Sequence, residues 1–175
     1  AGAMLFGLQS YSSTASLKFA QVSDAHFYTG ANNTTYKMVG ESPKLLDDVI
    51  EQINETPNVS FVMFTGDQID KPFEKELSAF LPHTEKLNVP WYFAFGNHDT
   101  MYGGYLTPRV YMDLVNNYNK NYKFEKSYYS FVPQKGYKAI VLDTIIRDRL
   151  TTNGKLGDEQ LQWLDNELAN SKKDT

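Results

Sequence analysis

Three apolar runs stand out along the first part of the chain, and each of them ends in polar residues. They are Leu17–Asp24, Ser60–Asp67 and Val89–Asn97, with the sequences LKFAQVSD, SFVMFTGD and VPWYFAFGN. Short apolar runs that stop at glycine or at a polar residue are typical of buried β-strands. We therefore predict three buried strands whose carboxyl ends carry polar side chains.

The segments between these runs have the spacing of amphipathic helices. Residues 42–56 begin with Ser42 and Pro43, an N-cap and a first-turn residue. One face of this helix carries the apolar residues Leu45, Leu46, Val49, Ile50 and Ile53. The next helical segment carries Leu77, Phe80, Leu81 and Leu87, and we expect Pro82 to interrupt it. The order strand, helix, strand, helix, strand predicts an α/β fold with parallel strands.

Shorter elements follow in the second half of the chain. Residues 107–119 predict a short helix, and residues 126–144 predict two strands joined by a turn at Gln134–Gly136. The last helix begins at Gly157 and Asp158, and its apolar stripe consists of Leu161, Leu164 and Leu168. No repeat and no linker divides the sequence, which favours one domain.

Composition narrows the classes of function. The chain has 175 residues, a formal net charge of −4 and a pI of about 5.4, so we do not expect it to bind a nucleic-acid duplex. It has no cysteine, which leaves oxygen and imidazole nitrogen as the metal ligands it can offer. No stretch approaches the roughly 18 apolar residues of a membrane span.

The first fifteen residues differ from the rest because they are small and apolar and carry no charge. Two interpretations of residues 1–15 stay open, the remnant of a signal peptide or a disordered N-terminus. Residues 16–175 then form the folded part. Export from the cytoplasm and a cytoplasmic location are both compatible with this start.

Polar side chains gather where the three predicted strands end. They are, strand by strand, Asp24 and His26, then Asp67, then Asn97, His98 and Asp99. Asp24 and His26 are two positions apart, so on an extended segment they project to the same side and can hold one ion. Ligands of open α/β sheets bind beyond the carboxyl ends of the strands, where Asp67 and Asn97 can join them. The sequence therefore predicts a metal site at this edge of the sheet.

The pattern is specific because three motifs, each weak on its own, occur together. An Asp-x-His after a strand is more often a turn with a surface histidine, and Gly-Asp is a common turn dipeptide. Three such groups at the ends of three successive strands are hard to explain as independent turns. Gly66 and Gly96 stand just ahead of the polar residues, as expected where the backbone approaches a ligand closely.

The three groups resemble the signature of the calcineurin-like metallophosphoesterase family, which reads Asp-x-His, Gly-Asp-x-x and Gly-Asn-His-Asp/Glu, followed by a single His and by Gly-His-x-His. The first three blocks stand here as DAH, GDQID and GNHD. The segment GKLGDEQLQWLDNEL resembles the helix that precedes the family's later histidine in the cyclic-nucleotide phosphodiesterase-like branch. The last two blocks are absent, since the histidines are His26, His83 and His98.

This resemblance implies an α/β fold, the calcineurin-like phosphoesterase sandwich of β-sheets flanked by helices. Residues 16–175 would be the N-terminal portion of the domain, without its C-terminal strands. The implied reaction is hydrolysis of a small phosphoester, in the first place a phosphodiester, by two metal ions (Mn, Fe or Zn) and a hydroxide that bridges them. The implied metal ligands are Asp24, His26, Asp67 and Asn97, with His98 as general acid and Asp99 holding its imidazole.

Two alternatives remain beside the phosphodiesterase. One is a phosphomonoesterase or nucleotidase of the same family, and the other is a non-catalytic binding module with a degenerate site. The second ion would keep only Asp67 and Asn97 as ligands, so we expect the chain alone to be weakly active or inactive. The identity of the substrate and the oligomeric state stay open.

Overall fold

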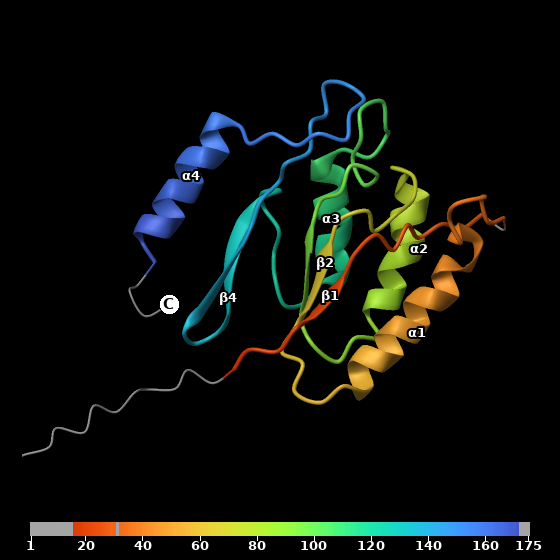
Figure 1. Cartoon of the computed structure of the whole chain (residues 1–175), viewed down its shortest axis with the longest axis horizontal. Coiled ribbons are helices and arrows are strands. Elements are labelled where there is room, and N and C mark those ends of the chain that lie inside the picture. The colour runs from red at the N-terminus through yellow and green to blue at the C-terminus, as the bar shows by residue number, and fades with distance from the viewer. Residues whose placement is uncertain (1–15, 31, 172–175) are drawn as a thin grey trace, which may run out of the picture.

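The structure is a computed structural model, and it describes residues 16–30 and 32–171. The interpretation of residues 1–15 as a signal-peptide remnant lies outside the described residues. Figure 1 shows the elements in layers, with helices on one side of a parallel sheet and a two-stranded ribbon with a further helix on the other. The predicted α/β fold of sheets flanked by helices is confirmed.

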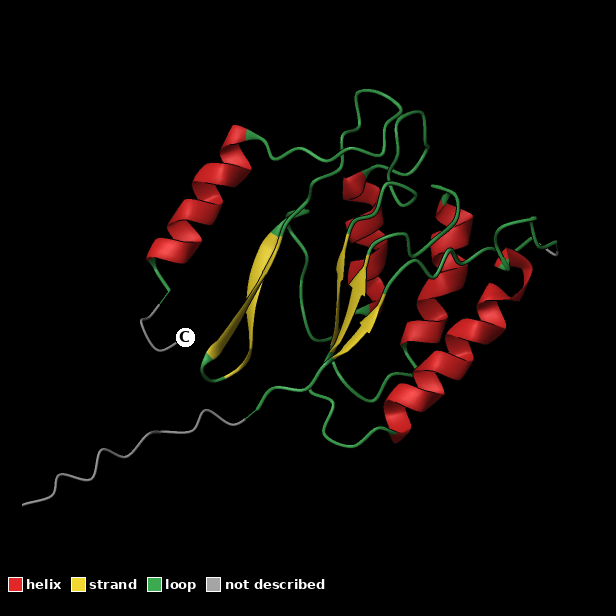
Figure 2. Ribbon diagram, in the orientation of Figure 1, coloured by secondary structure: helices red, strands yellow, loops and turns green. Residues whose placement is uncertain are grey.

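The central sheet is built from the three predicted strands. These are β1 (Ala20–Val22), β2 (Val62–Thr65) and β3 (Trp91–Ala94), in the order β1-β2-β3 and parallel throughout. Because they are parallel, their carboxyl ends lie at one edge of the sheet, which is visible in the ribbon diagram of Figure 2.

Three helices cover one face of this sheet. They are α1 (Ser42–Glu55), preceded by the short 3₁₀ helix η1 (Val39–Glu41), then α2 (Glu74–Thr84) and α3 (Pro108–Tyr118). Phe64 of β2 meets Phe80 of α2 with ring centroids 5.6 Å apart, and Phe93 of β3 meets Tyr111 of α3 at 5.2 Å. Within the described residues, no helix is long and apolar enough to cross a membrane.

Two helices differ in detail from the expectation. Leu46 and Ile50 of α1 are buried, whereas Leu45 is 44% exposed. The face of the helix that packs on the protein is therefore narrower than the stripe of apolar residues along it. The helix α2 continues through Pro82 instead of ending there. The carbonyl that loses its N–H partner to a proline belongs to the residue four positions earlier, here Ser78, which is exposed and accessible to water.

The ribbon consists of β4 (Tyr129–Gln134) and β5 (Tyr137–Val141), antiparallel and joined at Lys135 and Gly136 as predicted. It packs on the face of the sheet opposite the helices. The rings of Tyr92 in β3 and Phe131 in β4 stack with centroids 3.6 Å apart, so aromatic side chains fill the space between the two sheets.

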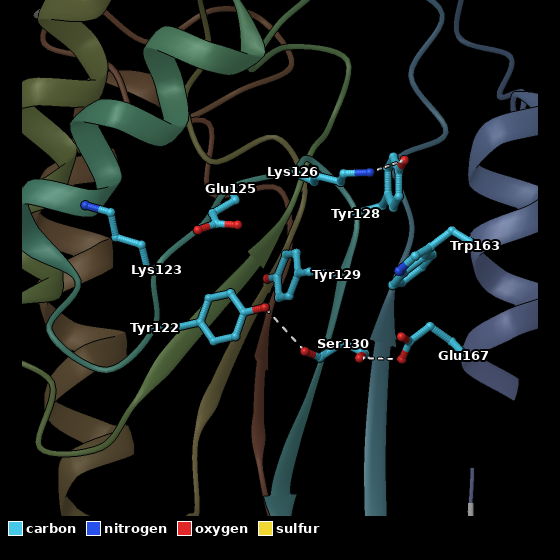
Figure 3. A pocket seen from close by; sticks show the side chains of 9 residues that line it. All are labelled: Tyr122, Lys123, Glu125, Lys126, Tyr128, Tyr129, Ser130, Trp163 and Glu167. Atoms are coloured by element: carbon cyan, nitrogen blue, oxygen red, sulfur yellow. Dashed lines mark hydrogen bonds between the residues drawn. The ribbon is translucent and has the colours of Figure 1, made fainter. Parts of the chain in front are cut away.

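The last helix, α4 (Asp158–Ala169), lies outside the ribbon, and its burial differs from the expected apolar stripe. Leu161 and Leu168 are 42% and 56% exposed, and the buried residue of the helix is Gln160. Polar contacts attach α4 to the ribbon, such as the bond from the Ser130 hydroxyl to Glu167 at 2.7 Å. Figure 3 shows this contact in a hollow of about 240 Å³ between β4 and α4.

Tyr129 ties the ribbon to the outer edge of β3. Its buried hydroxyl accepts the N–H of Phe93 at 3.0 Å and donates to the carbonyl oxygen of Phe93 at 2.6 Å. We expect Tyr129→Phe to lower the free energy of unfolding by about 1–3 kcal/mol, because it leaves a buried N–H and a buried carbonyl without partners. Urea unfolding measures this, with Tyr36→Phe as the control because Tyr36 is 94% exposed. Equal stability of the two variants would contradict the assigned role of Tyr129.

Candidate metal centre

The strand ends predicted to bind metal lie side by side. Beyond β1 and β2 the backbone pairing continues, since the N–H of Asp24 donates to Gly66 and the N–H of His26 donates to Asp67, at 3.1 and 2.9 Å. The third strand end joins them because the N–H of His98 donates to Oδ1 of Asp67 at 2.9 Å. The three polar groups, far apart in sequence, therefore form one cluster around Asp67.

Three residues of the cluster have a left-handed backbone. The φ angles are +54° for Asp24, +43° for His26 and +51° for Asp67. A non-glycine residue in this region costs on the order of 1–3 kcal/mol, and such residues gather at functional sites. The chain thus accepts strain at the residues whose side chains it brings together.

Metal-ligating atoms of three residues lie within reach of one ion. His26, Asp67 and His98 each offer one such atom, and these atoms lie within 4.8 Å of one another. Oδ2 of Asp67 lies 3.7 Å from Nε2 of His26, and Oδ1 of Asp24 lies 4.0 Å from the same nitrogen. The side chain of Asp24 is the exposed member of the cluster, and its carboxylate accepts a hydrogen bond from Ser23.

This donor set fits a transition metal ion. Imidazole nitrogen and carboxylate oxygen together suit Zn, Mn and Fe, without any thiolate. Burial lowers the pKa of His26, and the charges of Lys37 and His98 lower it further. The imidazole of His26 is therefore neutral at neutral pH, which is the form that binds a metal ion.

A second carboxylate and a lysine lie behind His26. Oδ1 of Asp70 is 3.2 Å from Nδ1 of His26, and Nζ of Lys37 is 3.1 Å from that oxygen. A carboxylate on the far nitrogen of a metal-binding histidine fixes the orientation of the ring. Asp70 and Lys37 are not among the predicted site residues, because no sequence pattern connects them with the strand ends.

The structure corrects the expected partner of His98. Nδ1 of His98 lies 2.7 Å from the backbone carbonyl oxygen of Asp70, so this carbonyl orients the imidazole. The carboxylate of Asp99 instead accepts the N–H of Gly96 at 2.8 Å and the N–H of Ile69 at 3.2 Å. The reason is the turn at Gly96–Asp99, which folds the Asp99 side chain back onto its own backbone.

Asp99 is fully buried, with 0% of its surface exposed. Burial raises the pKa of its carboxyl to about 8, while the backbone N–H donors of Gly96 and Ile69 oppose the shift. By bonding both loops, Asp99 fixes the second strand end against the third. Asn97 lies in the same turn, between Gly96 and His98, and is partly buried.

Gly96 allows the close approach of the two loops. A Cβ atom at this position would lie 2.1 Å from both N and Oδ1 of Asp67. We expect Gly96→Ala to lower the free energy of unfolding by about 1–3 kcal/mol through overpacking, and to weaken Zn²⁺ binding about 10–100-fold by displacing Asp67. Urea unfolding and isothermal titration calorimetry measure the two effects.

Gly157→Ala is the matched control for this substitution. A Cβ at Gly157 meets no atom within 4 Å, and Gly157 is the N-cap of α4 with φ −80°. The control is expected to cost less than about 1 kcal/mol, the difference between glycine and alanine as caps, and to leave Zn²⁺ binding unchanged. Native Zn²⁺ affinity in Gly96→Ala would contradict the expected displacement of Asp67 as a ligand.

A cavity of about 210 Å³ opens beside Asp24 and His26. Lys37, Met38 and Leu45 contribute to its lining. Sites for drug-sized ligands measure roughly 300–1,000 Å³, so this cavity has room for a small organic group next to the candidate ligands.

Comparison with known proteins agrees with this geometry. The family model described as calcineurin-like phosphoesterase matches residues 17–175. A protein named as a probable glycerophosphodiester phosphodiesterase, from Arcobacter nitrofigilis, is 26% identical over 158 residues, which are 85% of this chain and 50% of that protein.

A solved structure with a similar chain path is that of phosphopantetheinyl hydrolase from Mycobacterium tuberculosis. The TM-score is 0.41 and the sequence identity 13%, over 90% of this chain and 53% of that chain. A likeness this distant carries no argument about function. The chain spans about half the length of each of these two proteins.

Proposed function

Because the chain belongs to the calcineurin-like phosphoesterase family, we propose that it supplies the metal centre of a metal-dependent phosphodiesterase. The observation that carries the proposal is the convergence of Asp24 and Asp67 on His26, with carboxylate oxygens 4.0 and 3.7 Å from its Nε2. A ring nitrogen of His98 lies within 4.8 Å of ligand atoms of His26 and Asp67. The relative named as a glycerophosphodiester phosphodiesterase supports a diester as substrate. The small cavity beside His26 favours a small phosphoester.

The proposed centre would hold two ions. Asp24, His26 and Asp67 would hold the first, and Asp67 and the amide oxygen of Asn97 would hold the second. Two such ions, when bound, activate a water molecule as nucleophile and neutralise phosphate oxygens. The mixed oxygen and imidazole ligands favour Mn, Fe or Zn.

The residues of the chain have separate tasks in this proposal. A carbonyl oxygen can only accept, so the contact with Asp70 keeps one proton of His98 on Nδ1 and leaves Nε2 for the leaving oxygen. As general acid His98 is the imidazolium, which gives its Nε2 proton to the leaving oxygen and becomes the neutral ring protonated on Nδ1. Asp99 acts on the turn rather than on the imidazole, by holding the N–H groups of Gly96 and Ile69.

Metal titration and hydrolysis assays test the proposal. Calorimetry with Zn²⁺ and Mn²⁺ is expected to show one tightly bound ion and a second, weaker one, because Asp67 and Asn97 are the proposed ligands of the second ion in this chain. Turnover is therefore expected to be weak or absent. The assay is repeated on the full product of the gene, since the chain spans about half the length of the relative.

Two substrates separate the phosphodiesterase from its alternatives. Bis-p-nitrophenyl phosphate is a generic diester, and p-nitrophenyl phosphate is the matched monoester. We expect the full gene product to hydrolyse the diester faster in the presence of metal. Faster hydrolysis of the monoester would favour the phosphomonoesterase or nucleotidase, and metal binding without hydrolysis of either would favour the binding module.

A further inference from the structure

Arg147 contacts both sides of the turn that carries Asn97 and His98. Its Nε donates to the hydroxyl of Thr100 at 2.9 Å, directly after the turn. Its guanidinium lies 5.3 Å from the ring centroid of Phe95, directly before the turn. Hydrogen bonding and cation–π contact thus hold the two ends of the turn with one planar group.

Two residues fix the turn, Asp99 within it and Arg147 from the loop after β5. The carboxylate of Asp99 accepts the N–H of Gly96. Thr100, which follows the turn, is only 2% exposed, and its hydroxyl accepts a hydrogen bond from Arg147. A shift of Thr100 would move the turn and the imidazole of His98 with it.

Arg147 is itself held by Asp143. The two terminal nitrogens of the guanidinium donate to the two carboxylate oxygens of Asp143, at 3.0 and 3.1 Å. Such a two-pronged pair sets the plane of the guanidinium as well as its position. Each of its three nitrogens thus donates a hydrogen bond within the protein, so Arg147 is placed to hold the loop.

The contacts continue to α4. Gln160 accepts the N–H of Asp143 at 2.8 Å and donates to the carbonyl oxygen of Asp143 at 2.7 Å. Gln160 is the buried residue of this helix, whereas Leu161 and Leu168 are exposed. The loop from β5 to α4 runs beside the loop that follows β3 in Figure 1, so a remote helix is connected with the candidate metal centre.

We propose that Arg147 is a positioning residue for the Asn97–His98 turn, held in place by Asp143 and by Gln160 of α4. This proposal rests on the proposed function, because positioning the turn affects activity only if His98 and Asn97 serve the metal centre. The contacts themselves do not depend on a bound ion.

The histidines provide a direct readout. The sequence has three, His26, His83 and His98, so a ¹⁵N spectrum of histidine-labelled, metal-free protein resolves each ring. The spectrum is recorded about two pH units above the ordinary histidine pKa of roughly 6.5, so that tautomers are compared. We expect native His98 to carry its proton on Nδ1, because it donates to the carbonyl of Asp70.

Arg147→Met is the test, and Arg149→Met is its matched control, since Arg149 stands in the same loop and is 66% exposed. In Arg147→Met we expect His98 to show a mixture of tautomers and Zn²⁺ affinity to fall about 10–100-fold, the usual effect of losing a residue that orients a metal ligand. His83 is the internal control, because it pairs with Asp47 between α1 and α2. Arg149→Met should leave both readouts unchanged.

A lower melting temperature with an unchanged His98 spectrum would make Arg147 merely structural and would overturn the proposal. If Arg147→Met does not fold, Thr100→Val removes only the hydroxyl that Arg147 bonds, and a native His98 spectrum in that variant overturns the proposal as well. A chain that binds no Zn²⁺ at all would refute the proposed function, while the metal-free spectra still decide the role of Arg147.

Discussion

Asp67→Asn is expected to weaken Zn²⁺ binding by more than about 100-fold, beyond the loss typical of residues that only orient a ligand. Asp67 lies at the centre of the cluster, with Oδ2 3.7 Å from Nε2 of His26 and Oδ1 bonded to the N–H of His98. Its carboxylate is the negative charge that both proposed ions share. Calorimetric titration of the metal-free chain with Zn²⁺ measures the loss.

The choice of asparagine separates metal binding from folding. Asp67 has φ +51°, a conformation that asparagine tolerates better than alanine, and the amide oxygen can still accept the N–H of His98. Asp67→Ala is expected to lose metal binding together with some stability. Asp113→Ala is the control for removing a carboxylate, because Asp113 is 56% exposed and pairs with Arg109 on α3. Native Zn²⁺ affinity in Asp67→Asn would refute the proposed centre.

The sequence predicts the scaffold of the site well for a physical reason. A strand covered on both faces must be apolar along its length. Phe64 of β2 packs against Phe80 on the helix side of the sheet, and Tyr92 of β3 packs against Phe131 on the ribbon side. Parallel strands then bring their carboxyl ends to one edge without any further information. Strand order brings Asp24, His26 and Asp67 to one edge. Their backbone there is left-handed, however, and not the extended segment expected for Asp24 and His26.

Side-chain partners could not be predicted in the same way. Asp99 is adjacent to His98 in sequence, which suggests a contact, but in the turn its carboxylate points to the N–H of Gly96 instead. The partner of His98 is a backbone carbonyl, that of Asp70, and a backbone atom leaves no signal in the sequence. Neighbours along a turn project in different directions, so sequence adjacency is a poor guide to contact.

Helix α4 shows a second reason for failure. The spacing of Leu161, Leu164 and Leu168 indicates an apolar face, but spacing does not say whether another element covers it. Here the contact that matters comes from a polar residue, Gln160, through two hydrogen bonds to the backbone of Asp143. Burial of a glutamine becomes intelligible only when its partner across the loop is known.

His98→Ala is expected to slow the hydrolysis of an alkyl phosphodiester by about 10²–10⁴ in the metal-loaded full product of the gene, the usual contribution of a general acid. The loss should be much smaller for bis-p-nitrophenyl phosphate, because p-nitrophenolate leaves without needing a proton. Zn²⁺ affinity should stay near the native value. Turnover of both substrates and calorimetry, each on native protein and on the variant, measure the three quantities.

Metal affinity decides between the two tasks that the geometry allows for His98. One of its ring nitrogens lies within 4.8 Å of ligand atoms of His26 and Asp67, so the imidazole is near enough to bind the ion itself. If His98→Ala loses Zn²⁺ as severely as Asp67→Asn, the imidazole is a ligand and the general-acid assignment is wrong. His83→Ala is the control, since His83 pairs with Asp47, contacts the ring of Phe27 and is not a member of the group of candidate ligands. It should change neither turnover nor affinity. An equal loss of rate on both substrates with intact metal binding would also contradict proton donation, because only the alkyl leaving group requires the proton.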